Sequence, residues 1–269
     1  MSKKRLDILL VERGLVDSRA LAQRLVMAGQ VRVGGQVALK PGQEVASSAS
    51  IEIDWGPAYV SRGGEKLSAA LQAFQLKIHG WVCADVGAST GGFTDCLLQN
   101  GAARVYAIDV GKGILHWKLR QDPRVRIMEE TNARYITRLP EPVQLVTIDA
   151  AFISLKILLP AVKGWFGRPA ETEKNFDSHT IALVKPQFEA GRAVAAHGAG
   201  VIRSPQLHRQ ILQDVLEFSQ AAGFTAYGLI RSPLVGPKGN VEFLAWFALH
   251  ELEGVERPDA GALLSGLFD

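Results

Sequence analysis

The sequence predicts an α/β protein: a doubly wound, mainly parallel sheet with an antiparallel last strand, preceded by a small basic domain. Two observations favour the sheet. Apolar runs of strand length alternate with helical patterns from Trp81 onward, and a strand at 82–85 leads through a glycine-rich turn into a helix at 93–99. The small domain is indicated by charge, because residues 1–40 carry eight basic and three acidic side chains in a chain of net charge +3.

The N-terminal residues predict two short helices and a hairpin. Leucines at helical spacing predict a helix that ends near Gly14, and a second helix that Asp17 or Ser18 caps and that ends at Gly29. The alternating segment 31–37 surrounds two glycines, which is typical of a tight hairpin.

A turn-rich segment marks the end of the small domain, so we divide the chain into residues 1–58, residues 59–250 and a tail at 251–269 that carries little signal. The polar loops at 168–179 and 188–202 connect elements of the sheet, and the second is a candidate lid. The elements expected in the second domain are, in order, a helix at 66–74, the strand at 82–85, the helix at 93–99, a strand at 104–109, a helix at 113–120, strands at 125–128 and 143–148, a helix at 154–164, a strand at 180–184, a helix at 205–222, and a hairpin of strands at 224–230 and 241–248.

The composition excludes several classes of protein. With 47% hydrophobic and 21% charged residues, it is typical of a soluble protein. No apolar run approaches the roughly 20 residues of a membrane span, and acids interrupt the apolar stretch after the basic start. We therefore expect no membrane partner and a cytoplasmic location. Cys83 and Cys96 are expected in the core, and the six histidines form no ligand-spaced cluster, so we expect no metal site.

The glycine-rich turn after the first sheet strand is a candidate ligand site. Gly87, Gly91 and Gly92 follow a strand that ends in Asp85, and the next strand ends in Asp109, where such folds place a carboxylate for ribose hydroxyls. Neither the Gly-x-Gly-x-x-Gly pattern nor a P-loop lysine is present. A turn without a ligand is the alternative, but the two acids together resemble an S-adenosylmethionine-dependent methyltransferase.

The N-terminal pattern resembles an S4 RNA-binding domain. The resemblance covers about residues 5–50 and rests on Arg-Leu-Asp at 5–7, Ser-Arg-Ala-Leu-Ala at 18–22 and Ala-Gly-Gln-Val-Arg-Val at 28–33. It implies basic side chains that contact RNA phosphates, whereas the alternative is an ordinary solvated helix face. The side chains that we expect to contact RNA are Arg5, Arg13, Arg19, Arg24, Lys40 and Arg62.

Four ionisable residues stand at strand ends or beside glycine and proline turns. They are Lys66, Asp149, Lys185 and Glu242. Lys185 is the most informative, because it directly ends an apolar strand and precedes Pro186, so it is either a snorkelling surface residue or is aimed at the ligand edge. Each position alone is more readily structural, but together they form a set that can be tested against a mechanism.

These segments are similar to the TlyA family of ribosomal RNA methyltransferases, often labelled hemolysin A, and to the FtsJ-like ribose methyltransferases. The resemblance covers about residues 5–250. It implies a Rossmann-like S-adenosylmethionine methyltransferase domain, with ribosomal RNA or ribosomal subunits as the partner. Its motifs are Tyr-Val-Ser-Arg-Gly-Gly-Glu-Lys at 59–66, Asp-Val-Gly-Ala-Ser-Thr-Gly-Gly-Phe-Thr-Asp at 85–95, Asp-Val-Gly at 109–111, Trp-Lys-Leu-Arg at 117–120, Asn-Ala-Arg at 132–134, Lys-Pro-Gln-Phe-Glu at 185–189 and Gly-Asn-Val-Glu at 239–242. The residues that it implies for S-adenosylmethionine are Asp85, Gly87, Ala88, Ser89, Thr90, Gly91, Gly92, Phe93, Asp109, Val110, Asn132 and Ala133.

In this family a Lys-Asp-Lys-Glu tetrad carries catalysis, and the resemblance assigns it to Lys66, Asp149, Lys185 and Glu242. On this hypothesis Lys185 activates a ribose 2′-hydroxyl and the two carboxylates orient the lysines. Lys66 holds the hydroxyl or an adjacent phosphate.

The chain departs from the family pattern in three places. It has Asp-Ala-Ala at 149–151 where the family usually has Asp-Val-Ser, Gly-Lys-Gly-Ile-Leu at 111–115 for Gly-x-Gly-Gln-Leu, and Glu-Glu-Thr-Asn at 129–132 for Glu-Arg-Thr-Asn. Two alternatives belong to other classes of function: a non-catalytic RNA-binding or ribosome-assembly factor, and a membrane-lytic hemolysin. The oligomeric state cannot be derived from these patterns.

Overall fold

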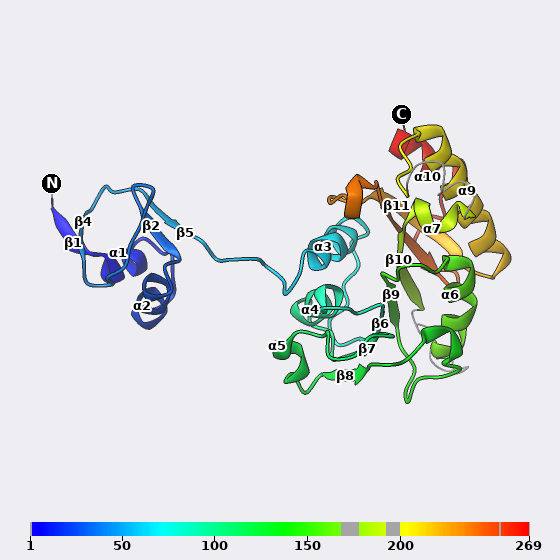
Figure 1. Cartoon of the computed structure of the whole chain (residues 1–269), viewed down its shortest axis with the longest axis horizontal. Helices are drawn as coiled ribbons and strands as arrows, with labels where there is room; N and C mark the ends of the chain where they lie inside the picture. Colours follow the sequence, from blue (N-terminus) through cyan, green and yellow to red (C-terminus); the bar gives the residue numbers. More distant parts are fainter. Residues whose placement is uncertain (1, 168–177, 192–199, 253, 269) are drawn as a thin grey trace. The chain divides into compact units, whose positions relative to one another are not determined.

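A computed structural model describes residues 2–167, 178–191, 200–252 and 254–268 (Figure 1). The chain divides into two compact units, Met1–Ala58 and Tyr59–Asp269. The N-terminal unit holds two helices, a three-stranded sheet of order β3-β2-β5 and an antiparallel β1–β4 pair. Its elements are β1 (Lys3–Arg5), α1 (Leu6–Glu12), α2 (Arg19–Met27), β2 (Val31–Val33), β3 (Gln36–Val37), β4 (Glu44–Ala46) and β5 (Ile51–Ile53).

The two helices and the hairpin of the first unit lie where the sequence predicts them, whereas β1, β4 and β5 were not predicted. Ser18 is the residue that caps α2, because its Oγ accepts a hydrogen bond of 3.2 Å from the backbone N–H of Leu21. Gly14 and Gly29 follow the helices with φ of +64° and +72°, conformations that glycine adopts without strain.

A buried carboxylate holds the first unit together. Asp7 is fully buried and accepts hydrogen bonds from Arg5, Arg19 and Gln23. The hydrogen bond from the Arg5 guanidinium is the main reason why the pKa of Asp7 lies well below its usual range. Two of the arginines that we expect to contact RNA, Arg5 and Arg19, therefore donate hydrogen bonds to an acid of their own domain.

The second unit is built on a seven-stranded sheet of order β11-β12-β10-β9-β6-β7-β8. β12 is antiparallel to both of its neighbours and the other paired strands run parallel, which confirms the predicted fold class. The strands are β6 (Val82–Val86), β7 (Arg104–Ile108), β8 (Val125–Met128), β9 (Leu145–Ile148), β10 (His179–Val184), β11 (Thr225–Arg231) and β12 (Phe243–Ala248).

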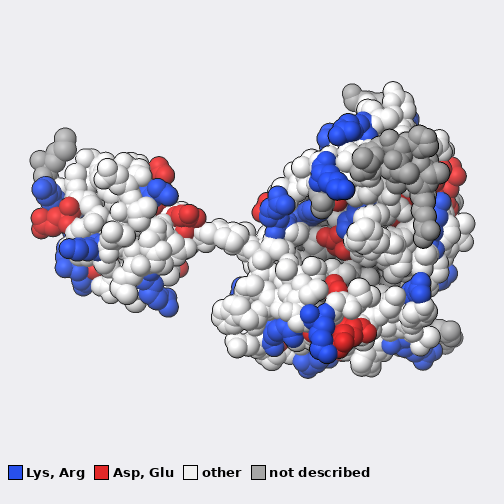
Figure 2. Space-filling view, viewed as in Figure 1, with Lys and Arg blue, Asp and Glu red and all other residues white. Residues whose placement is uncertain are grey.

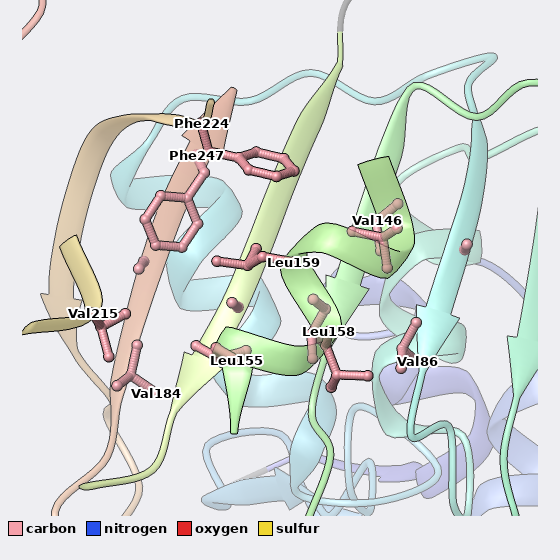
Figure 3. Packing of buried hydrophobic residues seen from close by; sticks show 14 of the residues in the cluster. Val86, Val146, Leu155, Leu158, Leu159, Val184, Val215, Phe224 and Phe247 are labelled. Atoms are coloured by element: carbon pink, nitrogen blue, oxygen red, sulfur yellow. The ribbon is translucent and has the colours of Figure 1, made fainter. Parts of the chain in front are cut away.

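Helices cover both faces of this sheet (Figure 1). On one face the core includes side chains of α3, α4 and α5, and on the other it includes side chains of α6, α9 and α10. Figure 3 shows the second core, where Leu155, Leu158 and Leu159 of α6 pack towards Val146 and Val184 of the sheet. The helices are α3 (Gly63–Ala73), α4 (Gly92–Gln99), α5 (Trp117–Arg120), α6 (Leu155–Val162), α7 (Pro186–Glu189), α9 (Pro205–Ala221) and α10 (Ala260–Phe268), with short 3-10 turns η1 (Ala133–Tyr135), η2 (Lys163–Trp165) and η3 (Pro237–Gly239).

The helix predicted at 113–120 is shorter than expected, because α5 comprises only its last turn. Gly113 has a φ of +70°, outside the helical region. Arg120 of α5 donates a hydrogen bond of 2.9 Å to the carbonyl oxygen of Leu115 and pairs with Glu129, which holds this segment as a turn.

Other boundaries also differ from the expectation. α3 begins at Gly63, three residues earlier than predicted, and the tail forms α10, which packs on α9 and β11. The loop predicted at 168–179 and the candidate lid at 188–202 fall largely outside the described residues. The described start of the second segment belongs to α7.

A second buried acid joins three elements of the sheet. Asp85 of β6 is fully buried, and its carboxylate accepts hydrogen bonds of 2.7 Å from Thr94 Oγ1 on α4 and 3.0 Å from Thr147 Oγ1 on β9. Burial in this site raises the pKa of Asp85 to about 7.

We predict that the effect of Asp85→Asn on the free energy of unfolding depends on pH. The substitution should favour the folded state more at pH 8 than at pH 4. The ordinary pKa of 3.8 applies to the unfolded chain and a pKa of about 7 to the folded one. Between these values the unfolded state releases its proton first, so this carboxyl lowers the free energy of unfolding as pH rises, by on the order of a few kcal/mol. Asparagine does not titrate. Urea unfolding of both proteins from about pH 4 to pH 8 measures this difference, and a difference that is constant with pH contradicts the assignment.

Candidate active site

A cavity of about 1000 Å³ lies at the carboxyl ends of the parallel strands. It lies in the second unit, one face of which Figure 2 shows. The turns after β6, β7 and β9 and the residue after β10 all contribute side chains to its wall. The chemically active part of the lining is Lys66, Asp109, Asn132, Asp149 and Lys185.

The turn after β6 approaches the turn after β9 very closely. Gly87 has a φ of +81°, and a Cβ atom there would lie 2.5 Å from the carbonyl oxygen of Asp149. Only glycine fits this contact, because both the conformation and the space exclude a side chain. The glycine predicted for backbone approach to a ligand thus brings two turns of the site together.

Asp109 links the turns that follow β6 and β7. Its Oδ2 accepts a hydrogen bond of 2.8 Å from Ser89 N–H, and its Oδ1 accepts one of 2.7 Å from Gly111 N–H. Asn132 caps η1 by accepting a hydrogen bond from Arg134 N–H. Carboxylate and amide groups therefore stand on the cavity wall, already oriented by backbone donors.

Ten of the twelve residues predicted for the cofactor line the cavity: Gly87, Ala88, Ser89, Thr90, Gly92, Phe93, Asp109, Val110, Asn132 and Ala133. The other two do not. Asp85 turns its carboxylate to Thr94 and Thr147, and a Cβ at Gly91 would lie 2.2 Å from a methyl carbon of Leu119. Both residues contact the interior of the domain on the side of the turn away from the cavity.

The four predicted catalytic residues form two ion pairs. Lys185 Nζ lies 2.6 Å from Asp149 Oδ1 and donates a hydrogen bond of 3.2 Å to the carbonyl of Ala150. Lys66 Nζ lies 2.6 Å from Glu242 Oε2. Each lysine side chain is 12% exposed, so both ammonium groups are nearly withdrawn from solvent.

The turn before β12 encloses Glu242. This residue is 1% exposed, and a Cβ at Gly236 would lie 2.2 Å from its Oε1. Glu242 Oε1 accepts no hydrogen bond within the described part of the chain. The residue therefore reaches the cavity through Lys66, since it is Lys66 that lines the wall.

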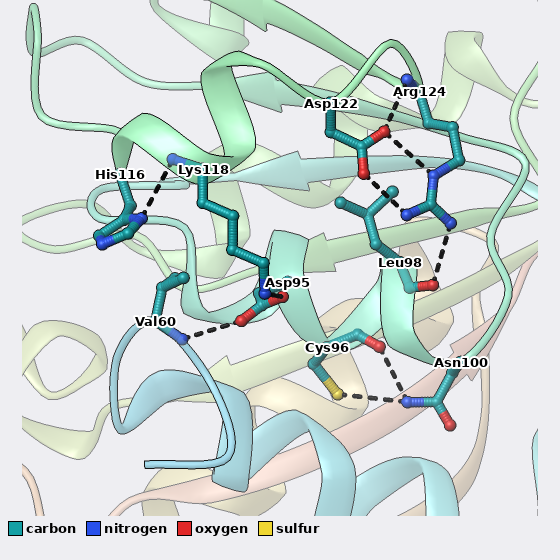
Figure 4. Close-up of polar contacts among 9 residues, drawn as sticks. All are labelled: Val60, Asp95, Cys96, Leu98, Asn100, His116, Lys118, Asp122 and Arg124. Atoms are coloured by element: carbon teal, nitrogen blue, oxygen red, sulfur yellow. Dashed lines mark hydrogen bonds and ion pairs between the residues drawn. The ribbon is translucent and has the colours of Figure 1, made fainter. Parts of the chain in front are cut away.

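Polar contacts around α4 fix the segment that leads to Lys66 (Figure 4). Asp95 accepts a hydrogen bond of 2.8 Å from the backbone N–H of Val60, and Lys118 Nζ lies 3.6 Å from the same carboxylate. Asp95 is buried, so this bond orders the backbone just before α3.

One further residue was not predicted to act in the site. Glu189 of α7 accepts hydrogen bonds of 2.6 Å from Ser154 Oγ and 2.9 Å from Leu155 N–H, at the start of α6. Desolvation raises the pKa of this carboxyl. The ring centroids of Phe152 and Phe188 lie 5.1 Å apart beside it, although Phe152 is 91% exposed with a φ of +63°. The sequence signal was Lys-Pro-Gln-Phe-Glu, in which only the lysine received a role.

The residues predicted to contact RNA separate into two groups. Arg5 and Arg19 contact Asp7, and Arg13 donates hydrogen bonds to the carbonyl oxygens of Ser47 and Ala49. The remaining three, Arg24, Lys40 and Arg62, are exposed, and Arg62 lines the cavity.

Two properties of the described residues bear on other classes of function. Within the described ranges, no group of three or more His, Cys, Asp or Glu side chains is placed to hold a metal ion. None of the helices seen in those ranges combines the length and the apolar character needed to cross a bilayer.

Comparison with known families and proteins places this geometry in context. The FtsJ-like methyltransferase family matches residues 59–249, and the S4 domain matches residues 4–51. The chain is 45% identical to the 16S/23S rRNA (cytidine-2′-O)-methyltransferase TlyA of Mycobacterium tuberculosis, over 91% of this chain and 89% of that protein. It is 38% identical to Hemolysin A of Brachyspira hyodysenteriae, over 91% of this chain and all of that protein. A solved structure titled "Putative hemolysin from Streptococcus thermophilus" matches with a TM-score of 0.69 and 39% identity, over 98% of this chain and 94% of that one.

We predict that Glu189→Ala lowers the free energy of unfolding by about 1–3 kcal/mol, because Ser154 Oγ and Leu155 N–H at the start of α6 lose their acceptor. Glu189→Gln should cost less, since the amide keeps one acceptor and can donate to Ser154 Oγ. Urea unfolding near pH 7 measures both. Glu217→Ala is the matched control, because this exposed glutamate on α9 only accepts from Gln213. An equal effect of the two alanine substitutions contradicts the prediction.

Proposed function

We propose that this chain, which belongs to the TlyA family of FtsJ-like methyltransferases, transfers a methyl group from S-adenosylmethionine to a ribose 2′-hydroxyl of ribosomal RNA. The observation that carries the proposal is the pairing of each cavity lysine with a carboxylate, Lys185 with Asp149 and Lys66 with Glu242. The S4 domain and the activity named for the Mycobacterium tuberculosis relative support RNA as the substrate.

The cavity wall formed by the turns after β6 and β7 fits S-adenosylmethionine. Asp109 would accept hydrogen bonds from ribose hydroxyls with the lone pairs that Ser89 and Gly111 leave, and Asn132 would contact the adenine side. The turn at 87–90 offers close backbone approach for the methionine part. When bound, S-adenosylmethionine supplies an electrophilic sulfonium methyl group.

Lys185 is the proposed base. A ribose hydroxyl is a poor nucleophile, so its proton must be removed or polarised. To act as a base, the Lys185 ammonium must first release one proton to solvent, and the neutral amine that remains has two N–H donors and one lone pair. Asp149 and the Ala150 carbonyl can take the two donors of Nζ, which leaves the lone pair for the hydroxyl proton. The ammonium that forms is then stabilised by the Asp149 carboxylate.

Lys66 is the proposed electrostatic partner of the substrate. Glu242 holds its ammonium at the cavity wall. A charged Nζ there can donate to the hydroxyl oxygen as negative charge develops on it, or to an adjacent phosphate. The two lysines thus divide the work of proton removal and charge stabilisation.

We predict that Lys185→Ala lowers methyl transfer to isolated ribosomal subunits by at least the 10²–10⁴-fold that is typical of a positioned base, while cofactor binding survives. Labelled S-adenosylmethionine measures the transfer, and calorimetry measures cofactor binding. Lys77→Ala is the control, because Lys77 is an exposed lysine just before β6, at the opposite edge of the sheet.

Two outcomes contradict this function. Wild-type protein that binds RNA but neither binds the cofactor nor transfers label is a non-catalytic RNA-binding factor. Release of dye from liposomes by both the wild type and Lys185→Ala, without transfer to RNA, supports the lytic alternative.

We further predict that Asp109→Ala weakens S-adenosylmethionine binding about 10- to 100-fold, the value of one charge-assisted hydrogen bond. The rate at saturating cofactor should fall much less, since Asp109 takes part in neither of the two lysine pairs. Titration calorimetry with the cofactor and transfer assays at two cofactor concentrations separate the effects. Unchanged affinity would remove Asp109 from the cofactor site.

A further inference from the structure

The start of α9 and the turn before β12 are joined around a buried histidine. His208 is 4% exposed, and its Nε2 lies 3.0 Å from the carbonyl oxygen of Ile202. Its ring meets the ring of Phe243 edge-on, with centroids 5.6 Å apart. Asn240 adds two hydrogen bonds, from Ile202 N–H to its Oδ1 and from its Nδ2 to the Gly200 carbonyl. These contacts fix three chain segments against one another.

Four exposed cations project from these segments. Arg203 follows Ile202, Arg209 follows His208, Arg231 ends β11 opposite Phe243, and Lys238 lies in η3. Burial is the main reason why the pKa of His208 is lowered, and the charge of Arg231 lowers it further. We name these four residues the α9–β11 surface.

The charges of this surface are not taken up by ion pairs in the part of the chain that the structure describes. None of its four cations makes an ion pair with a described residue, whereas Arg104, Arg120 and Arg124 elsewhere in the unit do. The exposed acids of α9 are Asp214 and Glu217, which lie on later turns and accept hydrogen bonds from glutamines. The surface therefore has a local excess of positive charge.

The α9–β11 surface borders the catalytic cavity. Leu234, Val235 and Gly236, which line the cavity, lie between Arg231 and Lys238 in the sequence. The same turn encloses Glu242, which holds Lys66. Arg231 and Lys238 thus flank the segment that lines the cavity, and the contacts of Asn240 and His208 join the segment of Arg203 and Arg209 to it.

We propose that Arg203, Arg209, Arg231 and Lys238 bind phosphates of the substrate RNA strand beside the catalytic cavity. The inference rests on the proposed function, because that function supplies the polyanion. Charge complementarity favours RNA, since a phosphate backbone offers regularly spaced anions to cations on a fixed scaffold. Insertion into a bilayer is not favoured, because Val235 is the one large apolar side chain exposed on the described part of this turn.

The test is the salt dependence of RNA binding by the full chain. The double substitution Arg231→Gln with Lys238→Gln removes two charges from the surface. It leaves both ion pairs, Lys66–Glu242 and Lys185–Asp149, intact. Each lost phosphate contact should reduce the slope of log affinity against log salt by about 0.7–0.9, so the double variant should lose about 1.4–1.8. The probe is ribosomal RNA from isolated subunits, titrated from about 50 to 300 mM KCl.

The matched control is Lys77→Gln with Arg138→Gln. Both side chains are exposed. Lys77 precedes β6 and Arg138 precedes β9, so both lie towards the amino ends of these strands, at the opposite edge of the sheet from the cavity. The control should keep the wild-type slope, and both double variants should keep wild-type affinity for S-adenosylmethionine, which also verifies folding. In transfer assays we expect a raised KM for RNA and an unchanged kcat for the α9–β11 variant alone.

Equal slopes for the α9–β11 variant and the wild type overturn the inference. So does a loss of binding to vesicles of anionic lipid with no change on RNA. Methyl transfer by the wild type tests the proposed function separately. If the wild type transfers methyl groups but the salt slopes of the wild type and the α9–β11 variant are equal, only the inference about the surface is overturned. If the slopes differ but the wild type transfers no methyl group, only the proposed activity is overturned.

Discussion

The site depends on a contact that only a residue without a side chain allows. The turn after β6 and the turn after β9 meet where Gly87 lies against the Asp149 carbonyl, closer than a Cβ atom could approach. β6 and β9 are adjacent parallel strands, so their carboxyl ends are already neighbours. The glycine converts that proximity into contact between the wall suited to a cofactor and the residue that pairs with Lys185. On the proposed function, this backbone contact brings the methyl donor and the acceptor hydroxyl to one place.

The two ion pairs are better explained by chemistry than by stability. A buried pair gains little net free energy, because desolvation of both ions offsets their attraction, whereas removing one partner costs about 3–5 kcal/mol. Lys66 and Glu242 come from elements far apart in sequence and are 12% and 1% exposed. An apolar pair would fill this position at lower cost. The retained charges are consistent with lysines whose ammonium or amine groups must act at defined points on the cavity wall.

Much of the fold could be predicted from the sequence, because strand-length apolar runs alternate with helical patterns and acids end the strands. Parallel topology then places Asp109 and Asp149 at one edge without further information. The roles of Asp85 and Gly91 could not be derived in this way. An acid at the end of a strand gives the same sequence pattern whether it faces a ligand or two threonines. Only the folded structure shows that Asp85 faces Thr94 and Thr147. The short α5 depended on a tertiary contact, the pairing of Arg120 with Glu129.

The basic residues also show that the sequence does not reveal the tertiary contacts of charged side chains. These contacts bear on substrate binding. The count of charges in residues 1–40 predicted an RNA-binding module, yet Arg5 and Arg19 contact Asp7 and Arg13 contacts carbonyl oxygens. These cations can still touch RNA, but part of their hydrogen-bonding capacity is spent within the domain. The cations of the α9–β11 surface come from three separate segments, so no local excess of charge marks them in the sequence. Their convergence follows from the contacts of His208 and Asn240, which are tertiary, and it adds to the methyltransferase unit a phosphate-binding capacity that charge counting assigns to the S4 domain alone.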